Sequence, residues 1–448
     1  MSSQQRVDVC TFLDDRPVSL RQWLIIFLGF ITLSVDGFDV TAMGFIAPAL
    51  IDDWQVARHD LGPLMMSGLF GLAAGSMISG PLADRFGRKI VIVGSVAFFG
   101  LASLISAWAW DLHSLTVLRF ITGIGLGAAM PNITTLIAEF APKRCRSHMS
   151  TAIHCGFNTG AALGGLASDY LINFFGWRAV LVAGGILPIC LTFILILLLP
   201  ESARFLAQHQ RYQERLRTMV NGFVAGLADS RTVFFNSEQQ INEKSAVKSL
   251  FLPAYGFGTL MIWLTLFIGL FSVYLLASWL PLLVRDSGLT ISQAVVIGAM
   301  FQMGGMVGNF CMGLAMDKWG QHRAIAMTIL GGAIGAGVLA LNEPSMAVLC
   351  PLVLVLGFTI NGINPGCYAL AAQFYPTRMR ATGVSWATGI GRFGAITGAG
   401  IGAMMLSANW SFNQVFMFLP IPLLVGVWAV CAKRRHGLRV NAEQSSGG

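Results

Sequence analysis

Two aspartates lie within a long apolar stretch near the start of the chain, residues 28–50 (LGFITLSVDGFDVTAMGFIAPAL). Asp36 and Asp39 are three residues apart, so a helix places both carboxyl groups on one side. An acidic side chain at membrane depth costs at least ~2.5–3.5 kcal/mol and persists where it faces a polar interior or a partner. Two carboxyl groups this close also disfavour simultaneous ionisation, which favours a bound proton. The stretch therefore predicts a proton or cation site, with two structural carboxyls at a helix break around Gly37 as the alternative.

Two arginines also lie inside apolar stretches. The rise per residue places Arg119 at a depth similar to that of Asp36 and Asp39, so we expect it to pair with one of these carboxylates; a purely structural ion pair is the alternative. Arg392 lies ~18 Å into its own stretch, near the membrane midplane. No acidic residue of its half of the chain shares that depth, and a guanidinium binds a carboxylate at two points. Arg392 therefore predicts an anion site, or a pair with Asp36 or Asp39 across the molecule.

The composition indicates an all-α membrane protein. Hydrophobic residues make up 55% of the 448 residues and charged residues only 11%, whereas a soluble domain carries roughly a quarter charged residues. The net charge of +8 does not indicate nucleic-acid binding, because the basic residues are spread over short loops. The eight cysteines show no paired C-x-x-C spacing, which argues against a zinc site or a disulfide framework. We expect no cofactor and no metal, and no set of residues indicates an enzyme.

About twelve membrane spans of ~20 apolar residues are expected. They fall near residues 23–50, 61–83, 90–109, 115–138, 148–171, 178–199, 257–283, 291–316, 324–341, 346–370, 381–406 and 413–432. The predicted organisation is an N-terminal tail (1–22), a six-helix bundle (23–199), a polar middle loop (200–254), a second six-helix bundle (255–432) and a C-terminal tail (433–448). The tails, the middle loop and the other loops of one side hold 24 of the 29 Lys and Arg residues, which by the positive-inside rule places both termini in the cytoplasm.

The two halves of the chain repeat each other. GPLADRFGRK from Gly80 recurs as GLAMDKWGQHR from Gly313, and EFAPKRCR from Glu139 recurs as QFYPTRMR from Gln373. Both matches are offset by about 233 residues. The prolines with the same offset are Pro48 and Pro281, and Pro131 and Pro365. Parallel six-span repeats imply a pseudo-two-fold axis along the membrane normal, with a substrate site between the halves.

These motifs carry a family resemblance. The Gly-x-x-x-Asp-Arg-x-Gly-Arg-Lys loop, the Arg119…Gly-x-Gly-x-Gly run and PESARFL (200–206) resemble signatures of the major facilitator superfamily. DGFD (36–39), MGFIAPAL, GAAMPN, YPTRMRATGVSW and GIGRFGAITG are similar to its aromatic acid:proton symporter branch, close to the 4-hydroxybenzoate and protocatechuate permeases. The resemblance implies twelve helices in two pseudo-symmetric bundles, and import of benzoate-type acids across a bacterial inner membrane. It also implies a proton-coupling role for Arg119.

Other side chains in the spans complete a candidate substrate site. Asn158 occupies the repeat-equivalent position of Arg392, so each half can place a polar group in the same substrate site. The candidates for contact with an aromatic ring are Phe38, Tyr274, Trp279, Tyr368 and Trp386, and those for a ring hydroxyl are Gln302, Asn309, Asn361 and Asn364. Each aromatic residue also has an alternative interpretation as a packing residue or a membrane-interface anchor.

The repeated loop is expected to act as a gate. By the resemblance, its first copy forms a breakable salt-bridge latch that stabilises the outward-open state. The residues of this latch are Asp84, Arg85, Gly87, Arg88, Lys89, Glu139, Arg144 and Arg146. In the second copy Asp317 repeats Asp84, but Gln321 and His322 stand where Arg and Lys are expected, which predicts a weaker latch there.

Together, the residues and the resemblance predict a proton-coupled importer of small aromatic carboxylates such as 4-hydroxybenzoate, protocatechuate or gentisate. Its partners are the acid, protons and the lipid bilayer, and we expect a monomer. The alternatives are an efflux transporter of the same fold, which the residues alone do not exclude, and a membrane chemoreceptor for the same acids. The middle loop is too short for a signalling domain, which argues against a receptor that acts alone.

Overall fold

The structure is a computed structural model that describes residues 6–8, 13–14, 17–142, 145–208, 212–223, 232–235, 247–252, 255–375 and 377–446. Its first half contains α1 (Leu20–Trp54), η1 (Arg58–Asp60), α2 (Leu61–Phe86), α3 (Arg88–Ser106), α4 (Leu112–Phe140), α5 (Arg146–Phe175) and α6 (Arg178–Leu198). The middle segment contains α7 (Ala203–Gln208), α8 (Gln213–Phe223) and η4 (Val247–Phe251). The second half contains α9 (Gly256–Asp286), α10 (Ile291–Trp319), α11 (Gln321–Leu341), α12 (Met346–Phe374), α13 (Thr377–Ser407), α14 (Phe412–Phe418) and α15 (Pro420–Ser446).

Eleven helices of the described chain are long and apolar enough to cross a membrane. α5 has 30 residues, which is ~45 Å of helix, but it is richer in polar residues and is not one of the eleven. The count of twelve spans therefore stays a prediction. α15 continues to Ser446, so the helix extends through most of the segment predicted as a C-terminal tail.

Local sequence determines where the helices begin and end. Ser19 and Thr290 form capping boxes at the starts of α1 and α10, where their hydroxyls accept a hydrogen bond from the backbone of the third helical residue. α2 and α10 end at Gly87 and Gly320, whose φ angles of 94° and 79° lie in the region that glycine adopts without strain. These two glycines are repeat-equivalent, so both copies of the loop turn in the same way.

The internal repeat extends to the packing between helices. α2 crosses α4 where Gly71 faces the carbonyl of Phe120, and α10 crosses α12 where Gly304 faces the carbonyl of Leu354. A Cβ atom on these glycines would lie 2.1 and 2.0 Å from those oxygens, so only glycine permits the close approach. The corresponding glycines between α1 and α5 and between α9 and α13 are Gly160 and Gly394. Because the pairs are offset by 233 or 234 residues, the two halves use the same helix crossings.

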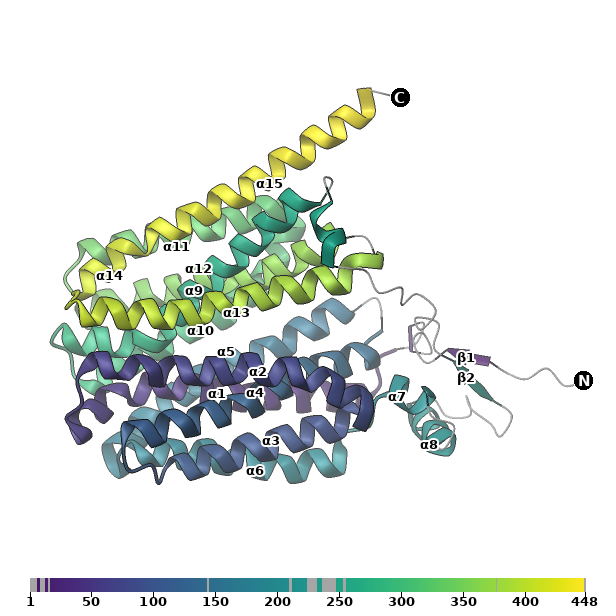
Figure 1. Ribbon diagram of the computed structural model, residues 1–448, viewed down its shortest axis with the longest axis horizontal. Coiled ribbons are helices and arrows are strands. Elements are labelled where there is room, and N and C mark those ends of the chain that lie inside the picture. The colour runs from purple at the N-terminus through teal and green to yellow at the C-terminus, as the bar shows by residue number, and fades with distance from the viewer. Residues whose placement is uncertain are drawn as a thin grey trace, which may run out of the picture.

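Figure 1 shows the two halves side by side, with α1–α6 in one bundle and α9–α15 in the other. Between the halves, α1 packs against α9, α2 against α13 and α5 against α10. The start of α1 and the end of α15 lie at one end of the molecule, the termini end, as do α7, α8 and the short parallel pair of β1 (Arg6–Asp8) and β2 (Val233–Phe235) (Figure 1). The other end is called the opposite end below.

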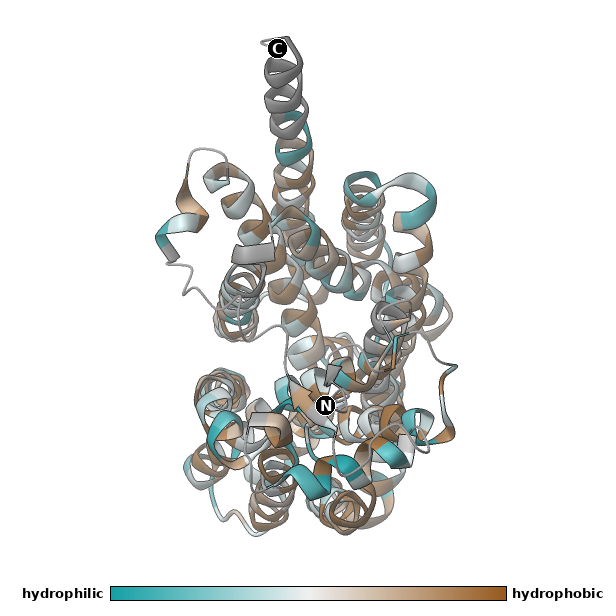
Figure 2. Ribbon diagram, turned by 90° about the vertical axis from the view of Figure 1, so that its right-hand side faces the viewer, coloured by the Kyte–Doolittle hydropathy of each residue, from teal (hydrophilic) through white to brown (hydrophobic). Residues whose placement is uncertain are grey.

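The outer surface of the helices is strongly apolar. Figure 2, which looks onto the termini end, shows mainly hydrophobic helices with hydrophilic segments near the viewer. Leu197 on α6 and Phe310 on α10 are 79% and 64% exposed. Large exposed apolar side chains along such helices are expected of a surface that faces lipid.

Candidate functional site

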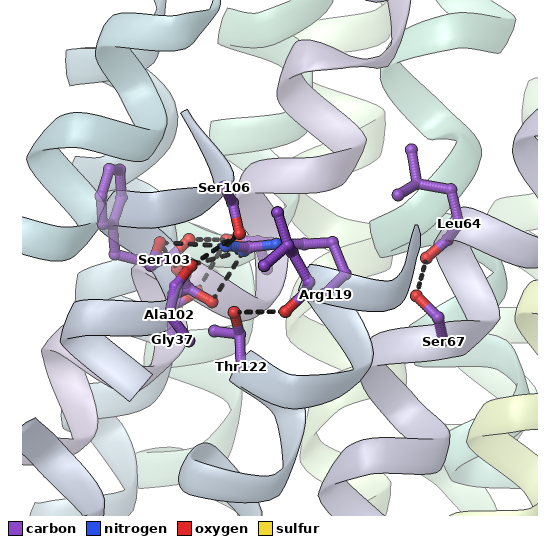
Figure 3. Close-up of polar contacts among 12 residues, drawn as sticks. Gly37, Leu64, Ser67, Ala102, Ser103, Ser106, Arg119 and Thr122 are labelled. Atoms are coloured by element: carbon purple, nitrogen blue, oxygen red, sulfur yellow. Dashed lines mark hydrogen bonds and ion pairs between the residues drawn. The ribbon is translucent and has the colours of Figure 1, made fainter. Parts of the chain in front are cut away.

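Asp39 and Arg119 form an ion pair buried between α1 and α4. Arg119 Nη1 lies 3.1 Å from Asp39 Oδ2 and 3.3 Å from Oδ1, and neither side chain is more than 3% exposed. Arg119 Nη2 donates hydrogen bonds to Ser103 Oγ (3.1 Å) and Ser106 Oγ (3.0 Å) of α3 (Figure 3). The sequence predicted that Arg119 pairs with one of the two carboxylates, and Asp39 is that residue. A role of the pair in proton coupling stays a prediction.

The two serines were missed by sequence reasoning. Ser103 Oγ also donates a hydrogen bond of 2.6 Å to Asp39 Oδ1, so it contacts both members of the ion pair. A Cβ atom on Gly184 of α6 would lie 3.2 Å from both of these oxygens, so α6 approaches the pair closely. The signal in the sequence was the spacing of three residues between Ser103 and Ser106, which puts both hydroxyls on one face of an apolar helix.

Arg392 belongs to a second polar group at the interface between the halves. It lies on α13, and its charge interacts with Asp36 of α1, Tyr274 of α9 and Tyr368 of α12. Arg392 Nη1 donates a hydrogen bond of 2.8 Å to the carbonyl of Leu72 on α2, which crosses from one half to the other. Among the residues described, Arg392 forms no ion pair, and Asp36 Oδ1 is buried without a hydrogen-bond partner. The interface thus holds a cation and an acid that are near each other but not directly paired.

A small cavity lies between the two polar groups. Its lining includes Asp39 and Arg119 of the ion pair, together with Tyr274 and Leu72 from the neighbourhood of Arg392. The cavity volume is about 40 Å³; one water molecule needs ~10–15 Å³, and ligand pockets have ~300–1,000 Å³. In this conformation the cavity has room for water but not for an aromatic ring.

The two tryptophans predicted to bind substrate have structural partners. Trp279 of α9 is 1% exposed, and its Nε1 donates a hydrogen bond of 2.8 Å to the carbonyl of Ala399 on α13. Trp386 of α13 is 45% exposed and stacks on Trp263 at a centroid distance of 6.0 Å. These contacts join α9 to α13 and correspond to the packing alternative in the sequence analysis.

The remaining predicted contacts are buried polar or apolar side chains. Gln302 is 2% exposed, and its Oε1 has no hydrogen-bond partner within the described ranges. Oδ1 of Asn309 and Oδ1 of Asn364 are unpartnered in the same way. An unpartnered buried acceptor costs ~1–3 kcal/mol, so these three amides are available to a ligand. Asn361 instead donates a hydrogen bond to the carbonyl of Gly357, one turn earlier on α12. Asn158 and Phe38 are buried on α5 and α1.

The described gating residues of the first loop copy lie at the termini end of the first half. Arg88 forms an ion pair of 3.0 Å with Glu139, which also accepts a hydrogen bond of 2.6 Å from Ser202. The backbone N–H of Lys89 donates to Glu201 Oε1, and a Cβ atom on Gly87 would lie 2.5 Å from the same carboxylate. The start of α3, the end of α4 and the segment before α7 therefore form one ionic cluster.

This cluster omits the acidic residue at the centre of the repeated loop. Asp84, Arg85 and the second-copy residue Asp317 are exposed, and none of the three forms an ion pair in the part of the chain that the structure describes. Arg144 lies outside the described residues, as does the side chain of Arg146. The role of these residues in a latch stays a prediction.

Two ion pairs join the halves at the opposite end. Arg58 Nη1 lies 2.9 Å from Asp286 Oδ2, and Arg285 pairs with Asp52. The sequence analysis used the basic residues here only for orientation and missed both pairs. Asp52 and Arg285 are 233 residues apart and thus repeat-equivalent. Equivalent positions near a pseudo-two-fold axis lie next to each other, so the repeat offset between Asp52 and Arg285 could have predicted their ion pair.

Comparison with known proteins agrees with this architecture. The Major Facilitator Superfamily profile matches residues 29–345 and 262–447. The chain is 46% identical over 430 residues to the 4-hydroxybenzoate transporter PcaK of Pseudomonas aeruginosa (96% of each chain) and 45% identical to the gallate transporter of Pseudomonas putida (97% of this chain, 96% of the relative). The xylose transporter XylE from E. coli, in a partially occluded inward-open conformation, shares the fold with a TM-score of 0.72 at 17% identity over 92% of this chain and 97% of its own. The chain belongs to the major facilitator superfamily and is a membrane transporter, not an enzyme.

Proposed function

We propose that this transporter is a proton-coupled symporter that imports small aromatic carboxylates across a bacterial cytoplasmic membrane. The observation that carries the proposal is the position of Arg392, a cation between the halves whose hydrogen bond goes to a neutral backbone carbonyl. A guanidinium in the membrane interior needs a polar cavity or an anionic partner, and it binds a carboxylate at two points. Relatives named as transporters of 4-hydroxybenzoate, gallate and gentisate support an aromatic acid as that partner.

The proposed transport cycle uses the two polar groups in sequence. Protonation of Asp39, with Asp36 as the second candidate, loosens the hold of Arg119 on α1. The substrate carboxylate is a stronger acceptor for Arg392 than a peptide carbonyl, because it carries the opposite charge and can accept two parallel N–H···O bonds from the guanidinium. It therefore displaces the Leu72 carbonyl from Arg392 and replaces a bond that holds α13 against α2. The halves then rock, and release of the acid on the other side returns the proton.

The charge distribution supports one orientation in the membrane. Most Lys and Arg residues of the described chain lie in segments at the termini end, and by the positive-inside rule this supports a cytoplasmic location for that end. The ion pairs between α1, η1 and α9 then close the periplasmic side in this conformation. We propose twelve spans, with α5 as the span beyond the eleven apolar helices, and one chain as the transport unit.

Asp39→Asn tests the coupling. The amide has nearly the same size as the carboxyl group but does not ionise, so we expect proton-driven accumulation to be lost while exchange of labelled for unlabelled acid is retained. The measurement is uptake of radiolabelled 4-hydroxybenzoate in a bacterial strain without its own permeases, with and without a protonophore. Asp53→Asn, at the exposed end of the same helix, is the control. Full accumulation by Asp39→Asn would remove this residue from the coupling role.

The same assay in energised right-side-out vesicles tests the direction. Accumulation of the acid inside the vesicles that stops on addition of the protonophore supports import. Extrusion of preloaded acid supports the efflux alternative, and saturable binding without movement supports a receptor. Either of these last two results would contradict the proposed function.

A further inference from the structure

We infer that Ser103 is a positioning residue for the Asp39–Arg119 pair, and that it sets the pH at which the Asp39 carboxyl group takes up and releases its proton. The inference rests on the proposed proton coupling and adds a residue to it. Ser103 Oγ donates to Asp39 Oδ1 at 2.6 Å and accepts from Arg119 Nη2 at 3.1 Å. Its side chain is fully buried in α3. The hydroxyl therefore bridges the carboxylate and the guanidinium of the pair.

Ser106 provides an internal comparison. It lies one turn along the same helix and holds the same Arg119 nitrogen at 3.0 Å. Its own proton goes to the carbonyl of Ala102 at 2.7 Å, so it does not reach Asp39. The two serines are thus alike in residue type, burial, helix and contact with Arg119 (Figure 3). They differ in the bond to the carboxylate.

The direction of the Ser103 bond determines its effect. Because Arg119 donates to the lone pair of Ser103, the Ser103 proton is directed toward Asp39. A hydrogen bond donated to the ionised form of a carboxyl group favours that form. Gly184 lies close to the two oxygens and has no side chain that could replace the donor. Without the Ser103 hydroxyl, Asp39 should therefore keep its proton at a higher pH.

The other charged and titratable groups near Asp39 are unchanged by this substitution. Arg119 faces Asp39 from α4, Asp36 lies one turn away on α1, and Tyr274 of α9 lines the same cavity. Arg392 of α13 interacts with Asp36 and Tyr274. On α5, His154 lies one turn before Phe157, whose carbonyl lies against Gly37 of α1. α2, α3, α6 and α10 carry charged side chains only at their ends. A shift in the pH profile therefore reports on the Ser103 hydroxyl.

The test is the pH profile of 4-hydroxybenzoate uptake into proteoliposomes at a fixed internal pH. For Ser103→Ala we expect the external pH of half-maximal uptake to rise by about one unit, the effect of one hydrogen bond to a charged group. Ser106→Ala should keep the wild-type midpoint even where its maximal rate falls. Ser103→Thr, which restores a hydroxyl, should return the midpoint to the wild-type value. Ser103→Cys, whose thiol is a weaker donor, should raise the midpoint by less than Ser103→Ala does. If the alanine variant does not fold, Ser103→Cys is used in its place.

A wild-type midpoint in Ser103→Ala, or in Ser103→Cys as its replacement, would overturn the inference. Equal shifts in Ser103→Ala and Ser106→Ala would also overturn it, because the effect would then act through Arg119 alone. Asp39→Asn in the same preparation separates this failure from failure of the proposed function. Accumulation by Asp39→Asn contradicts the proposed coupling itself, whereas loss of accumulation with an unshifted Ser103→Ala profile contradicts only the role of Ser103.

Discussion

Arg119 and Arg392 are both arginines in the membrane interior, but their partners differ. Arg119 contacts one carboxylate and two hydroxyls, all in its own half of the molecule. Arg392 contacts a backbone carbonyl of the other half and has no ion-pair partner in the described chain. A cation paired with a carboxylate responds when that carboxylate takes up a proton, whereas a cation without an ion-pair partner is available to an anionic ligand. We therefore assign proton coupling to the first and carboxylate binding to the second.

This assignment predicts a graded response at position 392. Arg392→Ala should raise the KM for 4-hydroxybenzoate uptake by roughly 10- to 100-fold, because a hydrogen bond to a charged group contributes ~1.5–3 kcal/mol. Arg392→Lys keeps the charge but loses the two-point geometry, so its KM should lie between those of alanine and wild type. Arg178→Ala, at the exposed opposite end, is the control for general effects of a lost arginine. An unchanged KM in Arg392→Ala would rule out direct recognition by this residue.

At the scale of helices, the sequence predicted the depth of each buried charge in the membrane but not the rotation of each helix about its own axis. The rise per residue was enough to place Arg119 at the height of Asp36 and Asp39. It did not determine which carboxylate Arg119 reaches, because that depends on how α1 and α4 rotate about their own axes. Ser103 was missed for the same reason, since an apolar helix carries little pattern to show which face is inward. The repeat, in contrast, was readable because its sequence matches share one offset, and the glycines at the helix crossings, such as Gly160 and Gly394, have nearly the same offset.

Those glycines predict where a helix crossing fails. A Cβ atom on Gly160 would lie 1.7 Å from the carbonyl oxygen of Ser34, so Gly160→Ala should force α5 away from α1 and destabilise the protein by ~1–3 kcal/mol or more. Gly94→Ala is the matched control, because a Cβ there meets no atom within 4 Å and alanine favours a helix. Thermal unfolding of the detergent-solubilised protein measures both. A melting temperature for Gly160→Ala at or above that of Gly94→Ala would contradict the packing described here.

At the scale of the whole molecule, the pseudo-two-fold relation brings equivalent residues together near the axis. Asp52 and Arg285 are such a pair, and their opposite charges turn a symmetric contact into an attractive one. The second pair, Arg58 with Asp286, lies beside it and also joins the two halves. No charged pair described in the structure joins the halves at the termini end. Alternating access requires these pairs to break whenever the opposite end opens.

Charge reversal across this end tests whether the pairs hold it shut. Exposed pairs contribute ~0.2–1 kcal/mol each, so Asp52→Arg, which faces Arg285 with a like charge, should shift the population toward the open state by about fivefold. The measurement uses Ser278→Cys in a background without the native cysteines, because Ser278 lines the internal cavity. A membrane-impermeant thiol reagent is added outside, and the rate at which it labels this cysteine is measured. Asp52→Arg combined with Arg285→Asp restores opposite charges and should return labelling to the starting rate.

The control for this reversal is a pair at the same end that stays within one half. Asp53 pairs with Arg178 at 3.1 Å, and both residues belong to the first bundle. Asp53→Arg places a like charge beside Arg178 and changes the net charge of the opposite end by the same amount, but it opposes no residue of the second half. Labelling should therefore rise in Asp52→Arg and stay near its starting rate in Asp53→Arg. Equal labelling in the two single variants would show that net charge controls access at this end, and not the contact between the repeats.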